Sequence, residues 1–237
     1  MKGWPGEPDM DYDVMMADGK AAANAGKPIT DVIFDFGNVL IYWDPAAVLV
    51  PRYDQETIER FLDNDVSGFY DGNDMMDGGA SPDEAIDWMR RTHGDQWADI
   101  LSYYIENFRD SLTGIVPGAR VLADDLKAAG IGVWGLSNWE KGLFHVAEEQ
   151  CDILEALDGK IVSGFVKLRK PHKDIYERAL QEFGIAADGA VFIDDKAMNI
   201  VGANEAGIRG VRFQDPVKLR ELLIEAGVRI PAVRSVR

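Results

Sequence analysis

The feature that most constrains the fold is a regular alternation of short apolar segments with amphipathic ones in the second half of the chain. IGVWGLS, GKIVSG, AVFIDD and RGVRF are short and apolar, as buried strands are. Helical patterns follow them in turn: WEKGLFHVAEEQ, PHKDIYERALQEFG, KAMNIVGANEAG and DPVKLRELLIEAG. Such alternation implies crossover connections. We therefore predict an α/β fold with a doubly wound, Rossmann-like parallel sheet, covered by helices on both faces.

One further strand is predicted much earlier, at ITDVIFDF, and the chain between it and the alternating half has a different character. Residues 45–113 are predicted to be wholly helical. SPDEAIDWMRR begins with a helix-start signature, in which Ser81 is the N-cap, Pro82 follows and Glu84 completes a capping box. We therefore expect a small helical cap domain, residues 45–113, inserted after the first strand of a core domain made of residues 29–44 and 114–237.

The first 28 residues mix Gly, Pro, Asp and Ala without sustained periodicity. We predict a flexible N-terminal extension there, with a short docked segment around Met15 and Met16 as the alternative. No apolar run approaches the roughly 20 residues of a membrane-spanning helix. A single cysteine, Cys151, excludes an intrachain disulfide, and the acidic N-terminus lacks the apolar region of a secretory signal. A cytoplasmic location is expected.

The formal net charge of −16 argues against partners that present a phosphate backbone or an anionic membrane surface. Neither nucleic acid nor membrane is therefore expected as a partner. A small anionic substrate is still compatible with this charge if a metal ion, a lysine or helix N-termini reverse the sign locally. The sequence does not decide between a monomer and a homodimer.

Polar residues gather where the predicted strands end. In an open parallel sheet, ligands bind beyond the carboxyl ends of the strands. The residues that the sequence brings to this edge are an acid, a hydroxyl and an amide, a lysine and two more acids: Asp35, Ser137, Asn138, Lys170, Asp194 and Asp195. Three carboxylates at one edge would repel each other unless a cation joined them, and their hard oxygens suit Mg²⁺.

The other groups suit a phosphoryl substrate. Lys170 supplies a positive charge and Ser137 a hydroxyl donor, and both are suited to phosphoryl oxygens. A carboxylate that is held by a metal and faces a phosphoryl group can act as a nucleophile. Asp35 is the candidate for this role, with an aspartyl-phosphate as the intermediate.

The segments IFDFGNVL, LSN, LRKP and FIDDKAMNI, in this order, resemble the four motifs of the haloacid dehalogenase (HAD) superfamily. The resemblance covers roughly residues 30 to 225, and the interval between the first two motifs is similar to that in members with a helical cap. It implies that Asp35 is the nucleophile, that Gly37 offers its backbone carbonyl to Mg²⁺ close to the substrate, and that Lys170 neutralises the phosphoryl group and orients Asp35.

The resemblance also implies roles for the second and fourth motifs. Ser137, with Asn138 and neighbouring N–H groups, would bind the phosphoryl group. Asp195 and Asp194 would bind the metal with Asp35 and Gly37, and Asn199 would support these ligands from one helical turn further on. Simpler interpretations exist for four of the site residues. Asp194 can cap the helix that follows and Asn199 can face solvent, while Ser137 can be a turn residue and Lys170 a solvated loop charge.

The departure from the family pattern is Gly37, where related phosphatases usually carry a second Asp that protonates the leaving group. Its absence removes a contribution of about 10²–10⁴ in rate. In the interpretation that we favour, the protein is still a phosphatase. The segment FDFGNVLI resembles the first motif of a branch of the family that includes glucose-1-phosphate phosphatases and the N-terminal domain of soluble epoxide hydrolase. The anomeric hydroxyl of an aldose 1-phosphate is a relatively acidic leaving group, so it depends less on protonation.

Two alternatives remain open. A metal-independent 2-haloacid dehalogenase also lacks the second Asp, but such enzymes generally lack the paired acids found at Asp194 and Asp195. The third possibility is a non-catalytic binding or regulatory protein on the same scaffold, against which the otherwise complete motif set argues.

The cap is the least informative part of the sequence. Asp44 is expected to serve a turn at the end of a strand. Several cap side chains are candidates for substrate contact, although Trp and Tyr at helical spacing are mostly core: Tyr70, Asp71, Asp74, Trp88, His93, Trp97 and Arg109. No replacement for the missing acid is identifiable from sequence.

Overall fold

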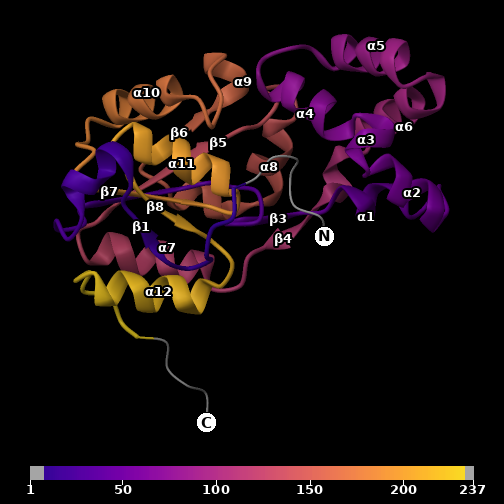
Figure 1. The fold of residues 1–237 in the computed structure, drawn as a ribbon. Coiled ribbons are helices and arrows are strands. Elements are labelled where there is room, and N and C mark those ends of the chain that lie inside the picture. The colour runs from indigo at the N-terminus through magenta and orange to yellow at the C-terminus, as the bar shows by residue number, and fades with distance from the viewer. Residues whose placement is uncertain (1–7, 233–237) are drawn as a thin grey trace.

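A computed structural model describes residues 8–232 and shows the predicted α/β architecture (Figure 1). The central sheet has the order β1-β8-β7-β2-β5-β6. All neighbouring strands pair in parallel except β1, which is antiparallel to β8. The strands are β1 (Met15–Met16), β2 (Asp31–Phe34), β5 (Gly132–Ser137), β6 (Gly159–Val162), β7 (Ala190–Asp194) and β8 (Arg209–Arg212).

Helices cover both faces of this sheet (Figure 1). Strand β2 has apolar side chains on both faces, and each face needs a cover of helices. Val32 and Phe34 pack in one apolar cluster, whereas Ile33 packs in another on the opposite face. Helices α10 and α11 belong to the side of Ile33, and α7 and α12 to the other. The helices of this part are α7 (Ala119–Ala128), α8 (Phe144–Gln150), α9 (Ser163–Val166), α10 (Lys173–Phe183), α11 (Ala197–Glu205) and α12 (Pro216–Glu225).

One predicted strand is shorter than its apolar pattern. The segment GKIVSG forms β6 only as far as Val162, and the short helix α9 begins at Ser163. The hydroxyl of Ser163 is used in tertiary hydrogen bonds, accepting from the backbone N–H of Trp139 at 3.0 Å. Long-range contacts of this kind determine where a short apolar segment leaves the sheet, and they are not visible in local periodicity.

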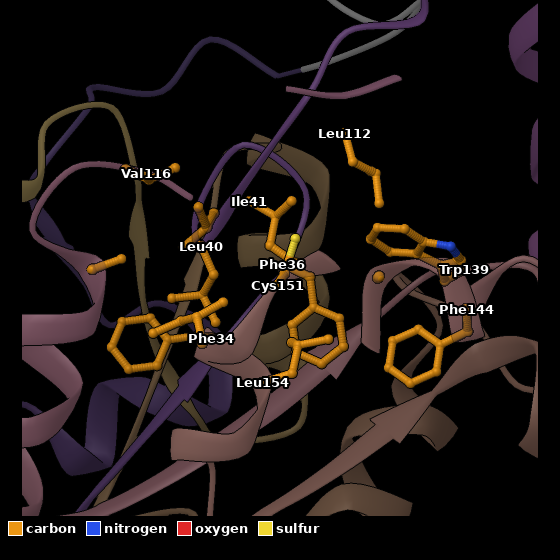
Figure 2. Close-up of a cluster of buried hydrophobic side chains, with 14 of the residues drawn as sticks. Phe34, Phe36, Leu40, Ile41, Leu112, Val116, Trp139, Phe144, Cys151 and Leu154 are labelled. Carbon is orange, nitrogen blue, oxygen red and sulfur yellow. The ribbon is translucent and has the colours of Figure 1, made fainter. Parts of the chain in front are cut away.

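An apolar cluster holds the turn that follows β2 (Figure 2). Phe36 is fully buried, and its ring centroid lies 5.9 Å from that of Phe144 and 6.5 Å from that of Trp139. The carbonyl oxygen of Phe36 accepts hydrogen bonds from the N–H groups of Leu40 and Ile41, each at 2.9 Å. The backbone at Phe36 is therefore fixed by packing and hydrogen bonding, and so is Asp35 immediately before it.

Residues 45–111 form the helical region, which lies to one side of the sheet (Figure 1). Strands β3 (Ile41–Trp43) and β4 (Leu112–Ile115) pair antiparallel at its base. The predicted capping box of α5 is present, and Asp44 caps α1 by accepting from the N–H of Ala46 at 3.0 Å. The helices of this region are α1 (Pro45–Leu49), α2 (Gln55–Phe61), α3 (Asn64–Ser67), α4 (Phe69–Asp77), α5 (Pro82–Thr92), α6 (Asp95–Glu106) and the 3₁₀ turn η2 (Phe108–Ser111). We call residues 45–113 the cap; its standing as a separate domain stays a prediction.

The N-terminal segment is docked on the sheet. Met15 and Met16 pair with β8, and the 3₁₀ helix η1 (Gly19–Asn24) follows. The side chain of Asn24 donates to the carbonyl of Gly207 at 2.9 Å. The expectation of a flexible extension therefore does not hold for residues 13–24, whereas the docked alternative does. The docking rests on backbone pairing at a sheet edge, which requires no side-chain periodicity. The part of that expectation that concerns residues 1–7 lies outside the described residues.

None of the helices within residues 8–232 is long and apolar enough to cross a membrane.

Candidate active site

The carboxylate of Asp35 lies at the end of β2 and is held by three donors. Its Oδ1 accepts from the backbone N–H of Phe36 at 2.7 Å and from the Ser137 hydroxyl at 2.7 Å. The ammonium of Lys170 lies 2.8 Å from the same oxygen. These donors fix the orientation of a buried carboxylate and stabilise negative charge on Oδ1. All three contact Oδ1, and none of them contacts Oδ2. The structure thus brings together the three predicted catalytic residues.

Lys170 is almost fully buried and joins two carboxylates. Its Nζ donates to Asp194 Oδ2 at 2.6 Å as well as lying against Asp35. Burial alone lowers the pKa of Lys170, but Asp194 and Asp35 outweigh that effect and raise it. Lys170 is therefore a fixed positive charge in the site. The face of Phe192, 5.2 Å from Nζ, adds a cation–π contact beneath it.

Two amide side chains position this charge network. The Asn138 side chain makes a reciprocal pair with the backbone of Lys170: it donates to the carbonyl at 2.9 Å and accepts from the N–H at 2.8 Å. Asn199 is buried and donates to Asp194, at 2.9 Å from Oδ1 and 3.0 Å from Oδ2. The solvent-facing interpretation of Asn199 is thus wrong. The amide of Asn138 positions Lys170, and its contact with substrate stays a prediction.

Asp35, Asp194 and Asp195 each offer a carboxylate oxygen, and these oxygens all lie within 4.8 Å of one another. Burial is the main cause that raises the pKa of Asp194 to about 7 and that of Asp195 to about 6, and the neighbouring carboxylates add to both shifts. Asp194 also accepts at Oδ1 from the N–H of Lys196, the residue before α11, but its side chain does not cap the first turn of that helix. Asp195 accepts from Asn38 at 3.5 Å.

A recess opens over this charge network, between the end of the sheet and the cap. The described residues that line it include every residue predicted for the site except Asp194, which lies fully buried beneath: Asp35, Gly37, Asn38, Trp43, Asn73, Asp77, Phe108, Ser137, Asn138, Trp139, Glu140, Leu143, Lys170, Asp195, Lys196 and Asn199. The recess therefore joins a charged floor to walls that are partly aromatic.

At Gly37 the recess has room for a side chain. An added Cβ would meet no atom within 4 Å, and the φ of Gly37 does not lie in the left-handed region. Neither steric crowding nor backbone strain therefore requires glycine. The residue that does adopt a left-handed backbone is Asn38, with φ 58°, and its side-chain oxygen accepts from the N–H of Trp43 at 3.2 Å.

The cap contributes residues that sequence reasoning missed. Asn73 and Asp77 from α4, Trp43 from β3 and Phe108 from η2 line the recess. None of the seven predicted cap candidates does: Trp97 is buried in the cap, Arg109 pairs with Glu149, and Asp74 pairs with Arg169. Helical periodicity identifies which cap residues are apolar, but it does not show which end of which helix meets the core.

Trp139 combines an aromatic wall with an unsatisfied donor. Its side chain is 7% exposed, and within the described part of the chain its indole Nε1–H reaches no acceptor. A buried donor without a partner is costly, so the position of this indole is set by its packing and not by a hydrogen bond at Nε1.

Sequence comparison gives relatives of several kinds. A sesquiterpene phosphatase of Aspergillus oryzae, astK, is 25% identical over 197 residues, which are 81% of this chain and 95% of that protein. The drimenol cyclase drtB of Aspergillus calidoustus is 27% identical over 77% of this chain but only 33% of its own length. A glyceraldehyde 3-phosphate phosphatase of Pyrococcus abyssi is 29% identical over 49% of each chain.

Solved structures share the fold. A HAD family enzyme of Bacteroides thetaiotaomicron, crystallised as a magnesium complex, aligns with TM-score 0.59 and 21% identity over 80% of this chain and 97% of that one. An L-2-haloacid dehalogenase of Xanthobacter autotrophicus aligns with TM-score 0.57 and 17% identity over 84% of each. The family model of the haloacid dehalogenase-like hydrolases matches residues 31–207, a range that contains all the predicted site residues. The chain belongs to the haloacid dehalogenase-like hydrolase family.

Proposed function

We propose that this hydrolase is a Mg²⁺-dependent phosphatase that acts on a small phosphorylated metabolite through an aspartyl-phosphate on Asp35. The observation that carries the proposal is the convergence of the Ser137 hydroxyl and the Lys170 ammonium on Asp35 Oδ1, beside two further carboxylates. A nucleophilic carboxylate must be oriented, and the developing charge of a transferring phosphoryl group must be met by donors placed in advance.

In the proposed reaction, Asp35, Lys170 and Ser137 have different roles. Asp35 attacks phosphorus and accepts the phosphoryl group. Lys170 and Ser137, at 2.8 Å and 2.7 Å from Asp35 Oδ1, also lie where they can donate to phosphoryl oxygens that approach this carboxylate. Water then releases phosphate and restores Asp35. The cap and the aromatic walls limit access of bulk water to the recess.

The cluster of three carboxylates suits Mg²⁺. Burial raises the pKa values of Asp194 and Asp195, and the neighbouring carboxylates add to this, so negative charge on the cluster is costly without a cation. A divalent cation held by Asp35, Asp194 and Asp195 would remove the repulsion between them. These residues and the Gly37 carbonyl would hold the ion. When bound, Mg²⁺ would neutralise phosphoryl charge and orient the phosphoryl group toward Asp35. Asp194 is already bonded to Lys170 and Asn199, so Asp35 and Asp195 would be the principal side-chain ligands.

The substrate class that the sequence suggests, a sugar phosphate such as an aldose 1-phosphate, agrees with the lining of the recess. Its aromatic residues Trp43 and Trp139 offer apolar surface against which a sugar ring can pack, beside polar side chains such as Asn73. A second candidate is an isoprenoid monophosphate. Trp43, Phe108 and Leu143 make a substantial part of the lining apolar, and the relative astK is a sesquiterpene phosphatase.

The alternatives are less well supported. Dehalogenases and phosphatases share this fold, so the alignment with solved dehalogenases does not separate them. The cluster of three carboxylates favours a cationic cofactor over metal-independent chemistry. A non-catalytic role would leave unexplained why a buried lysine and a hydroxyl are aimed at one oxygen of Asp35.

The experiment is phosphate release from a panel of aldose 1-phosphates, sugar 6-phosphates and farnesyl monophosphate, each with Mg²⁺ and with EDTA. Asp35→Asn is the test variant. Asp71→Asn, the same change at an exposed position outside the recess, is its matched control. Turnover that requires Mg²⁺ and Asp35, but not Asp71, supports the proposal. Equal turnover in EDTA or in Asp35→Asn contradicts it.

A further inference from the structure

The recess contains a buried acid that the mechanism above leaves unused. Asp77, the last residue of α4, is 8% exposed and lines the same recess as Asp35 and Gly37. We propose that Asp77 replaces the acid missing at Gly37: it protonates the leaving-group oxygen and then activates the hydrolytic water. This inference rests on the proposed phosphatase function and assigns a catalytic residue to the cap.

The end of α4 that carries Asp77 is held against the core by a hydrogen bond and an ion pair. Its backbone carbonyl accepts from the hydroxyl of Ser163 at 2.6 Å, and the same hydroxyl accepts from the N–H of Trp139. Asp74, one turn earlier on α4, forms an ion pair with Arg169 in the segment that leads to Lys170. Asn73 donates to Asp77 Oδ2 at 3.1 Å. The end of α4 is therefore fixed beside the catalytic loops, as a general acid requires.

The surroundings of Asp77 favour a group that can change its protonation state near neutral pH. Burial is the largest cause that raises its pKa to about 7, opposed by Lys196 and Lys170 and assisted by Asp74 and Asp35. These four charged groups come from α4, the end of β2, the loop before α10 and the start of α11. A carboxyl with a pKa near the working pH can both donate and accept a proton in one cycle.

The other candidate acid in the lining is already engaged. Glu140 follows β5 and is 4% exposed, but its Oε2 accepts from the backbone N–H of Leu143 at 2.7 Å. This contact holds the Glu140 side chain against the backbone of its own loop. Gly37 and Asp77 line the same recess, and the space beside Gly37 is open.

The proposed steps balance. The Asp35 carboxylate forms a bond to phosphorus while the phosphorus–oxygen ester bond breaks, and the proton of neutral Asp77 moves to the ester oxygen, which leaves as an alcohol. The Asp77 carboxylate then takes a proton from water as the water oxygen attacks phosphorus. The acyl-phosphate bond breaks, phosphate leaves, and Asp35 is again a carboxylate and Asp77 a neutral acid.

The test compares two Mg²⁺-supported substrates in the full-length protein: an alkyl phosphate, whose leaving group needs a proton, and p-nitrophenyl phosphate, whose leaving group does not. Asp77→Asn should lower kcat for the alkyl ester by about 10²–10⁴-fold. With p-nitrophenyl phosphate it should give a burst of p-nitrophenol and then slow turnover, because the missing base delays hydrolysis of the intermediate. Asp71→Asn, on the same helix but exposed, should resemble wild type on both.

A pH profile and a rescue separate catalysis from structure. The wild-type kcat for the alkyl ester should fall as pH rises through about 7, and this fall should be absent in Asp77→Asn. Because Gly37 has room for a side chain, Gly37→Asp in the Asp77→Asn background should restore alkyl phosphate turnover at least tenfold.

Three results would overturn the inference: an equal loss on both substrates without a burst or rescue, unchanged kinetics in Asp77→Asn, or the predicted signature in Glu140→Gln instead. If wild type forms no phosphoenzyme and releases no phosphate from either substrate, the proposed function fails with it. Wild-type turnover together with an unaffected Asp77→Asn variant would remove the Asp77 inference alone.

Discussion

Replacing Asp77 by Asn should make the protein relatively more stable at high pH. The pKa of Asp77 is raised from 3.8 to about 7, mainly by burial, so the folded state holds a proton that the unfolded state releases. Stability from this neutral carboxyl is fully present below pH 3.8 and is lost as pH rises toward about 7. Each pH unit within that window costs wild type about 1.4 kcal/mol.

Asn keeps the shape of the side chain and an acceptor for Asn73, but carries no titratable proton. Between pH 5.5 and 7 the free energy of unfolding of Asp77→Asn should therefore gain about 2 kcal/mol relative to wild type, and stay level above that range. Contributions of the other titratable groups largely cancel in this difference. The full range, from 3.8 to about 7, corresponds to about 4 kcal/mol.

The assay is urea unfolding of both proteins in EDTA at closely spaced pH values, with Asp71→Asn as control. Asp71 lies exposed on the same helix, so its variant controls for the exchange of Asp for Asn itself. A difference between Asp77→Asn and wild type that stays flat from pH 5.5 to 8, or that decreases, would refute the assignment of a neutral buried carboxyl at this position.

Two further predictions concern the charge network. Lys170→Met leaves Asp35 and Asp194 without their shared cation, so the free energy of unfolding should fall by about 3–5 kcal/mol in EDTA and turnover should be lost. Lys173→Met, which removes a solvent-exposed partner of Glu177, should leave the denaturation midpoint nearly unchanged in the same series. Asp195→Asn should raise the Mg²⁺ concentration that gives half-maximal activity. Residues that only support a metal ligand typically change metal affinity by roughly 10–100-fold, and the loss of a ligand should exceed this. A metal titration with an unchanged midpoint would exclude Asp195 as a ligand.

The core of the site was predictable because strand ends impose a common location. Residues that finish parallel strands must meet at one sheet edge whatever their separation in sequence. Asp35 and Ser137 accordingly share a hydrogen bond of 2.7 Å although they are 102 positions apart. Lys170 required the family resemblance as well, because a lysine in a loop is usually solvated, and nothing local indicates that this one is buried.

The acid from the cap could not be predicted in the same way. Asp77 is one of several acids in α4, and its sequence neighbourhood resembles that of Asp71 and Asp74. What distinguishes it is the hydrogen bond from Ser163, a residue 86 positions away in a segment that was predicted to be a strand. Tertiary docking of this kind also explains why Trp43 and Phe108, at the junction of cap and core, line the recess while the predicted candidates do not.

The central claim is that Asp35 carries the phosphoryl group. The most direct measurement is acid quenching of the enzyme during turnover with Mg²⁺ and p-nitrophenyl phosphate, followed by peptide mapping by mass spectrometry. Asp77→Asn serves as a second sample, because slow hydrolysis should enrich the intermediate. The account predicts a phosphoryl group on Asp35 in both samples and none in Asp35→Asn. Phosphate release with no adduct on Asp35, or with an adduct on another residue, would contradict it.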